Sequence, residues 1–348
     1  MDTPTLRILN ILSSSLGEPP SINQLTQRIK TTYGTAYYAN TYQKLQKLKK
    51  ENLFHIENLG NSSSIKLNFH NYLLTDILAE MEIEKKLCFL TTQDALLPLL
   101  TELTALTEDY TIKSVTALNP IKNHKLNRLE LLFILRKASD HPRICELISQ
   151  MLKLQNRYNY KINCLILEES DFQSQLSSDE ANPLKESLGE KIILYNPYSF
   201  WSTIKEAAEN TQIKPICASI KPADISDADL IYNLNRFGYK EFGFSIRQGK
   251  KFCIEYIITA ILLQEDARRT EAIPIILAKT KHNSNVLAFL SQKFDTAGKL
   301  LGLLYVLQEI KPTSETQDTI AFLKAFNPEV LPADKESILQ KMRLYHAL

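Results

Sequence analysis

Apolar residues in the first part of the chain recur first at helical spacing and then at strand spacing. Leu6–Leu12, Ser21–Lys30 and about Thr35–Asn52 each show the three- and four-residue spacing that predicts an amphipathic helix. Leu53–Glu57 and Ile65–Phe69 instead alternate apolar and polar residues, with turn-forming residues between them, as two paired strands do. The pattern therefore predicts three helices followed by a two-stranded hairpin.

The third predicted helix has two chemically different faces. One face is expected to be buried because its apolar residues recur every three or four positions, and these are Tyr38, Tyr42, Leu45 and Leu48. The polar residues on the other face of the helix are then expected to face solvent, and these are Thr35, Tyr37, Asn40, Thr41, Lys44 and Lys47.

Charge sets this segment apart from the rest of the chain. Residues 21–50 hold six basic side chains and no Asp or Glu, whereas the whole chain of 348 residues has a net charge of +2. A helix whose lysines only face solvent usually mixes them with Glu, so positive charge without acidic residues favours a polyanionic partner. The alternative, a solvated face on a protein-docking module, stays open.

The order of helices and hairpin resembles winged helix-turn-helix domains over roughly the first seventy to eighty residues. The resemblance implies that the third helix enters the major groove of DNA, where Asn40 can read adenine and hydroxyl groups can bond bases or phosphates. Basic residues at the helix end and on the wing are expected to contact phosphates, which gives salt-dependent affinity without sequence information. The predicted DNA-binding residues are Thr35, Tyr37, Asn40, Thr41, Lys44, Lys47, Lys49, Lys50 and Lys66.

Composition indicates a globular protein of several domains. The chain is 44% hydrophobic and 23% charged, and its length favours two or three domains. No apolar run is long enough to span a bilayer and the first residues lack the pattern of a signal peptide, so a cytoplasmic location without membrane contact is expected. The five cysteines are interpreted as reduced core residues. Neither they nor the six histidines show metal-ligand spacing, so no metal or cofactor is expected.

Beyond residue 86, short apolar strands alternate with helices, which predicts a sheet covered by helices. The strands are expected at 111–118, 129–135, 161–167 and 189–195, and the helices at about 92–108, at 142–158 and from Ser170. This order resembles the small nucleotidyltransferase fold over about Leu87–Tyr198. The corner at Leu165–Phe172 and the closing strand are the parts most similar to that family.

The positions that carry nucleotidyltransferase chemistry differ from the family pattern. The Gly-Ser turn of the family is replaced by Leu118–Pro120, its paired acidic residues fall on Arg128 and Glu130, and its third carboxylate falls near Asn163. Magnesium needs at least two converging oxygen ligands, and an arginine at the first position would repel the ion. The resemblance therefore implies a domain that keeps the shape without catalysis and serves as a binding or docking surface.

The last part of the chain is mainly helical by spacing. A helix is expected to open at Ala223–Leu234, a short ribbon with basic residues to follow around Gly249, and a helical bundle to complete the chain from Ile254. Residues 269–304 resemble the C-terminal part of prokaryotic proteins that join a winged helix to a nucleotidyltransferase-like domain, some of which are AbiE-type antitoxins.

These patterns, together with the two resemblances, imply an α+β multidomain protein with an N-terminal winged helix (1–85), a central α/β nucleotidyltransferase-like domain (86–212) and a mainly helical C-terminal domain (213–348). The expected function is that of a DNA-binding transcriptional regulator, in the manner of an antitoxin-like autorepressor, without enzymatic activity or catalytic residues. Double-stranded DNA is the expected partner, and a protein such as a toxin and a second copy of the chain are further candidates. Two alternatives stay open: a non-enzymatic scaffold whose winged helix binds protein, and an active nucleotidyltransferase that uses Glu130.

Overall fold

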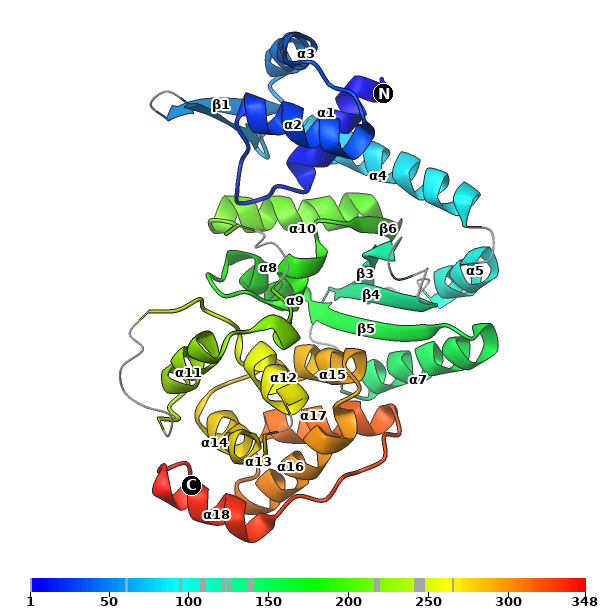
Figure 1. Ribbon diagram of the computed structural model, residues 1–348. Helices are drawn as coiled ribbons and strands as arrows, with labels where there is room; N and C mark the ends of the chain where they lie inside the picture. The colour runs from blue at the N-terminus through cyan, green and yellow to red at the C-terminus, as the bar shows by residue number, and fades with distance from the viewer. Residues whose placement is uncertain are drawn as a thin grey trace.

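The computed structural model shows a helix-rich α/β fold, so the predicted mixture of helices and sheets is confirmed. The N-terminal elements lie at one end, a sheet lies in the middle and the C-terminal helices lie at the other end (Figure 1). The structure describes residues 2–59, 62–93, 96–106, 111–120, 123, 127–136, 141–215, 220–240, 248–264 and 266–348.

Three helices, a hairpin and a long helix form the N-terminal end. Their bounds are α1 Thr3–Ser13, α2 Ile22–Tyr33, α3 Tyr38–Lys50, β1 Phe54–Leu59, β2 Ser62–Leu67 and α4 Tyr72–Thr92. The strands β1 and β2 pair antiparallel with Phe54 opposite Leu67, which confirms the predicted hairpin. Helix α1 contacts α2, α3, α4 and β2, so the apolar faces of these elements share one small core.

Local interactions fix where α2 begins and ends. Ser21 and Gln24 form a capping box, in which the Gln24 N–H donates to the Ser21 side chain at 3.2 Å and the Ser21 N–H donates to the Gln24 side chain at 2.8 Å. Gly34 follows the helix with a φ of 85°, a conformation that costs glycine little because it has no Cβ. The chain can therefore turn sharply from α2 into α3.

Helix α4 connects the N-terminal end to the sheet. It packs against α10 (Pro197–Asn210) and β6 (Lys191–Tyr195), and Lys86 Nζ donates to the Leu194 carbonyl oxygen at 3.3 Å. The spacing of apolar residues over 71–86 predicts a helix that ends near Lys86, but α4 continues to Thr92 because Phe89 in its last turns is buried. The next helix, α5, therefore begins at Leu97 and not near residue 92, and it spans Leu97–Leu106; residues 107–108 of the predicted helix lie outside the described residues.

The central sheet has the strand order β5-β4-β3-β6. The strands β4 and β5 are parallel, whereas β3 runs antiparallel to both β4 and β6. Helix α10 contacts β3 and β6, while α7 and α15 contact β5, so helices lie above and below the sheet in Figure 1. The predicted strands are confirmed, with bounds β3 Ile112–Leu118, β4 Arg128–Leu135, β5 Lys161–Glu168 and β6 Lys191–Tyr195.

Helices fill most of the remaining chain. Around the sheet these are α7 His141–Tyr158, α8 Glu169–Ser177 and α9 Pro183–Ser187. After α10 come η2 Pro222–Asp224, α11 Asp227–Arg236, α12 Ile254–Gln264, α13 Ala267–Thr270, α14 Ala272–Lys279, α15 Ser284–Lys293, α16 Ala297–Ile310, α17 Ser314–Ala325 and α18 Lys335–Leu344. The prediction that the chain is mainly helical from Ile254 on is therefore confirmed.

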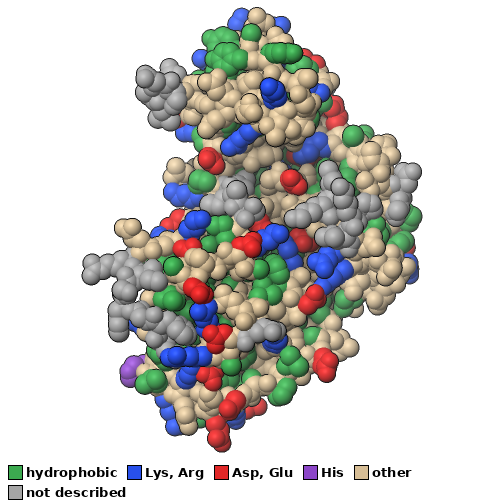
Figure 2. All heavy atoms as spheres, in the orientation of Figure 1, with side chains coloured by type: hydrophobic (Ala, Val, Ile, Leu, Met, Phe, Trp, Pro, Cys, Tyr) green, Lys and Arg blue, Asp and Glu red, His purple; other side chains and the backbone are tan. Residues whose placement is uncertain are grey.

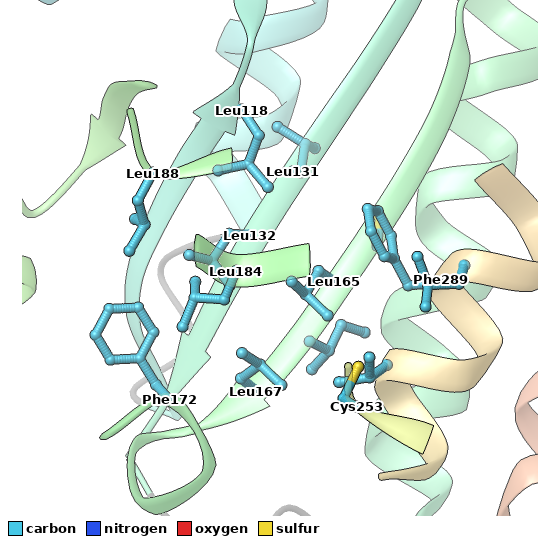
Figure 3. Packing of buried hydrophobic residues seen from close by; sticks show 14 of the residues in the cluster. Leu118, Leu131, Leu132, Leu165, Leu167, Phe172, Leu184, Leu188, Cys253 and Phe289 are labelled. Carbon is cyan, nitrogen blue, oxygen red and sulfur yellow. The ribbon is translucent and has the colours of Figure 1, made fainter. Parts of the chain in front are cut away.

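The sheet and the C-terminal helices share one hydrophobic core. Figure 3 shows Leu131 and Leu165 of the sheet in the same packed cluster as Phe289 of α15. Within the helical part, Gly302 lets the chain pass directly over α16, since a Cβ at this position would lie 1.8 Å from the Leu331 carbonyl oxygen. The C-terminal helices are thus fastened to the sheet and to each other by close packing.

Three further predictions can be compared with the structure. Most of the ribbon predicted near Gly249, including Arg247, lies outside the described residues, and Phe252 forms an isolated bridge with Ala181.

Cys164 and Cys253 are buried as predicted, but Cys88 is exposed because it lies on the outer side of α4. Within the described part of the chain, no helix is long and apolar enough to cross a membrane.

Candidate nucleic-acid interface

Helix α3 lies at the N-terminal end of the molecule, and Thr41, Leu45 and Leu48 form its buried side (Figure 1). The predicted faces are therefore wrong at three positions. Tyr38 and Tyr42, expected to be buried, are 49% and 42% exposed, whereas Thr41, expected to contact DNA, is only 7% exposed. Leu45 and Leu48 lie on a helical stripe with Thr41, and they also lie on a stripe with Tyr38 and Tyr42. Spacing alone therefore does not decide which of the two stripes is buried.

The first two predicted contact residues lie before α3 and not within it. The helix begins at Tyr38 and not near Thr35, and Tyr37 is its N-cap residue in an extended conformation. Thr35 and Tyr37 are both exposed, Tyr37 to 70%. Asn40 is exposed in the first turn. These three side chains therefore face solvent around the start of the helix.

The outermost stripe of α3 includes residues that the sequence pattern did not predict. Its members are exposed and follow one another at four- and three-residue spacing, and these are Ala39, Gln43, Lys47 and Lys50. Gln43 and Ala39 were missed because the tyrosines were assigned to the buried face. The sequence signal that identifies them is the stripe Thr41-Leu45-Leu48, which places Gln43 on the opposite side of the helix.

Aromatic side chains accompany the polar ones on this surface. The rings of Tyr38 and Tyr42 stack with a centroid distance of 6.1 Å and an angle of 14° between their planes. Hydrophobic and basic side chains gather at the upper end of the molecule in Figure 2, where α3 lies. The surface is thus neither purely basic nor purely apolar.

The lysines that are predicted to contact DNA differ in whether they already form an ion pair with an acidic residue of the protein. Lys47, Lys49 and Lys50 are exposed and form no ion pair with any other described residue. Lys44 Nζ lies 2.6 Å from Asp2 Oδ2, and Lys66 Nζ lies 2.6 Å from Glu57 on the paired strand. Both pairs are partly exposed, so a polyanion can displace the carboxylates at small cost.

The Lys44 contact also affects the charge state of its partner. The hydrogen bond from Lys44, with smaller contributions from Thr5, holds the pKa of Asp2 well below its ordinary range. Asp2 is therefore ionised throughout the neutral and mildly acidic range and reduces the local positive charge.

Residues 60–61 of the predicted wing turn lie outside the described residues.

A second candidate site lies where β4 and β5 begin. Leu118 at the end of β3 pairs with Glu130, and Glu130 pairs with Asn163 on β5. The positions that the nucleotidyltransferase resemblance singles out are thus neighbours in space. Glu130 is 4% exposed, and Lys293 Nζ from α15 lies 3.1 Å from its Oε2 atom.

The amide of Asn163 is fully buried beside this pair. Neither polar atom of its side chain has a hydrogen-bond partner among the described residues. Over the same part of the chain, no group of three or more His, Cys, Asp or Glu side chains is arranged to hold a metal ion. The site offers one carboxylate, and an ammonium group of the same chain already neutralises it.

A cleft of about 730 Å³ opens near the start of β5. Lysines and acidic residues both line it, namely Lys161, Lys299, Asp295 and Glu329, and Lys161 forms an ion pair with Asp295. Because the two signs of charge balance, the cleft shows no electrostatic preference for an anionic nucleotide.

Comparison with protein-family models, with curated proteins and with solved structures gives no match to this chain.

Proposed function

We propose that this chain is a DNA-binding transcriptional regulator, of the type of an antitoxin-like autorepressor, in which residues 1–85 act as a winged helix-turn-helix domain. The outer face of α3 carries the proposal, because three lysines that form no ion pair with any described residue follow an exposed, uncharged half of the same helix. The 13 residues of α3 make a rod roughly 20 Å long, and the diameter of an α-helix with its side chains, about 10–12 Å, fits a major groove about 12 Å wide. Lys47, Lys49 and Lys50 then contact phosphates, and Asn40 and Gln43 face base edges.

The central and C-terminal regions, 86–212 and 213–348, serve in this proposal for docking and not for catalysis. A toxin-like protein or a second copy of the chain is the expected occupant, since dimers match palindromic operators. The contact between Lys293 and Glu130 supports the absence of catalysis, because the ammonium group competes with a metal ion for the carboxylate. Magnesium-dependent nucleotide transfer that disappears in Glu130→Ala would contradict this part of the proposal.

Charge reversal on α3 tests the DNA-binding proposal. The double variant Lys47→Glu/Lys50→Glu is expected to lose about a hundredfold or more in duplex affinity at moderate salt. The matched control is Lys153→Glu/Lys221→Glu, which makes the same change in net charge at exposed lysines far from α3 in the sequence. Fluorescence anisotropy measures both. Equal binding by the α3 variant and the control would exclude α3 as the DNA contact.

The exposed tyrosines favour a second candidate function, a scaffold whose α3 binds another protein. Aromatic residues are enriched at protein interfaces and often supply much of their binding energy, and Tyr37, Tyr38 and Tyr42 are all exposed here. This candidate predicts no duplex affinity above background at moderate salt, together with a protein partner that co-purifies stably and is absent when the tyrosines are replaced.

A further inference from the structure

The exposed N-terminal half of α3 carries a restricted set of side chains. Residues 37–43 read Tyr-Tyr-Ala-Asn-Thr-Tyr-Gln, and all of them except Thr41 are exposed. This segment contains no Arg, Lys, Asp or Glu. The next basic residue, Lys44, is bonded to Asp2. The part of the helix that faces base edges in the proposed complex is therefore uncharged.

An uncharged reading surface of this kind distinguishes between base pairs. Guanine is most often read by Arg or Lys through its O6 and N7 atoms, and cytosine by Asp or Glu through its amino group. Asn and Gln instead pair with N6 and N7 of adenine, and apolar groups contact the 5-methyl group of thymine. Asn40 and Gln43 supply two adenine readers, whereas the residue types typical for G·C pairs are absent from residues 37–43.

The stacked tyrosines supply the apolar part of this surface. Tyr38 and Tyr42 are one helical turn apart, and their rings are nearly parallel with 14° between the planes. The two rings thus form a continuous apolar surface beside the outer stripe of the helix. A thymine methyl group that packs against them is removed from water, which stabilises the complex.

We propose, on the basis of the proposed function, that α3 reads an A·T-rich half-site in the major groove. Asn40 and Gln43 pair with adenines, and the rings of Tyr38 and Tyr42 pack against thymine methyl groups. The lysines at the C-terminal end of α3 hold that end on phosphates and so direct the uncharged end toward the bases.

Replacement of thymine by uracil tests this proposal, because it removes only the 5-methyl group. The full-length protein first selects its preferred duplexes from a random pool at moderate salt. Anisotropy then compares one selected duplex with a version in which uracil replaces each thymine. The expected result is a site dominated by A·T pairs and an affinity that falls about fourfold for each thymine methyl group that no longer packs against a tyrosine ring.

Variants at exposed positions connect the effect to α3 without disturbing the core. Tyr38→Ala/Tyr42→Ala is expected to bind the thymine and uracil duplexes equally and more weakly than the parent protein binds the thymine duplex. Tyr72→Ala, at a tyrosine of α4 that is 75% exposed, is the control and keeps the full difference. Asn40→Ala is expected to weaken binding about 5- to 150-fold and to relax the preference at one adenine.

The outcomes separate this inference from the function on which it rests. Selection of G·C-rich sites, or equal affinity for thymine and uracil duplexes in the parent protein, overturns the A·T proposal and leaves DNA binding intact. Failure to bind any duplex at low salt overturns both. Loss of a co-purifying protein in Tyr38→Ala/Tyr42→Ala, without any DNA affinity in the parent, assigns the tyrosines to the scaffold function.

Discussion

Helix α3 and the first residues of β4 and β5, around Glu130, both carry polar residues in patterns that indicate a binding site. The side chains at the two places have opposite surroundings. On α3 the lysines 47, 49 and 50 are exposed and unpaired within the described chain. On β4 the Glu130 side chain is buried against Lys293, and on β5 the Asn163 side chain has no exposed surface. Polar groups that face solvent are available to a partner, whereas enclosed groups act mainly on stability. This difference is why we propose the N-terminal end, and not the strand ends at Glu130, for the recognition role.

The largest expected effect comes from breaking the enclosed pair. Lys293→Met leaves the Glu130 carboxylate buried without its cation, which is expected to lower the free energy of unfolding by about 3–5 kcal/mol. Urea unfolding followed by circular dichroism measures the change. Duplex affinity of the folded variant is expected to stay the same, since the central sheet lies between α15 and α3 (Figure 1).

A double variant separates charge from packing at this pair. Glu130→Leu/Lys293→Met removes both charges, so most of the stability of the parent protein is expected to return. A double variant as unstable as Lys293→Met would show that the lysine acts through packing against Phe289 and Phe294 and not through the carboxylate.

A smaller effect of opposite sign is expected at Asn163. An unsatisfied buried amide costs about 1–3 kcal/mol, so Asn163→Leu, whose side chain has the same branched arrangement of heavy atoms, is expected to raise the free energy of unfolding by up to about that amount. Thermal unfolding at neutral pH measures it. Destabilisation instead would mean that the Asn163 amide has a hydrogen-bond partner in solution. The site beside Glu130 would then hold a bound molecule.

The smallest expected effect on stability is at the exposed pair beside α3. Asp2→Asn keeps a good N-cap residue for α1, so stability is expected to change by less than about 1 kcal/mol. The variant frees Lys44, however, and the slope of log affinity against log salt concentration is expected to become steeper by about 1. An unchanged slope in anisotropy titrations would show that the Asp2 carboxylate does not compete with DNA phosphate for Lys44.

The regular elements were predictable where local spacing decides them. The alternation at Leu53–Glu57 and Ile65–Phe69 gave the hairpin, and the apolar runs at 129–135 and 161–167 gave two neighbouring strands of the sheet. The alternating pattern of the hairpin has only one register that buries its apolar residues, and the two apolar runs are short enough to favour strands over buried helices. Local sequence was therefore enough to predict these strands.

The orientation of α3 and the neutralisation of Glu130 were not predictable in this way. Leu45 and Leu48 fit two stripes, and contacts with α1 and α2 decide that the stripe through Thr41 is buried. Lys293 lies 163 residues from Glu130 along the chain, so no local pattern connects them. Both features depend on tertiary packing, which spacing in a single sequence does not reveal.

Salt-dependent binding of the full-length protein to duplex DNA tests the central claim most directly. Anisotropy compares a duplex from the region upstream of the protein's own coding sequence with a scrambled duplex over several salt concentrations. If lysines 47, 49 and 50 each contact a phosphate, log affinity should fall linearly with log salt concentration with a slope of about −3 or steeper, and the upstream duplex should bind more tightly. Affinity that is absent, or that does not change with salt, would contradict the assignment of α3 as a DNA-binding helix.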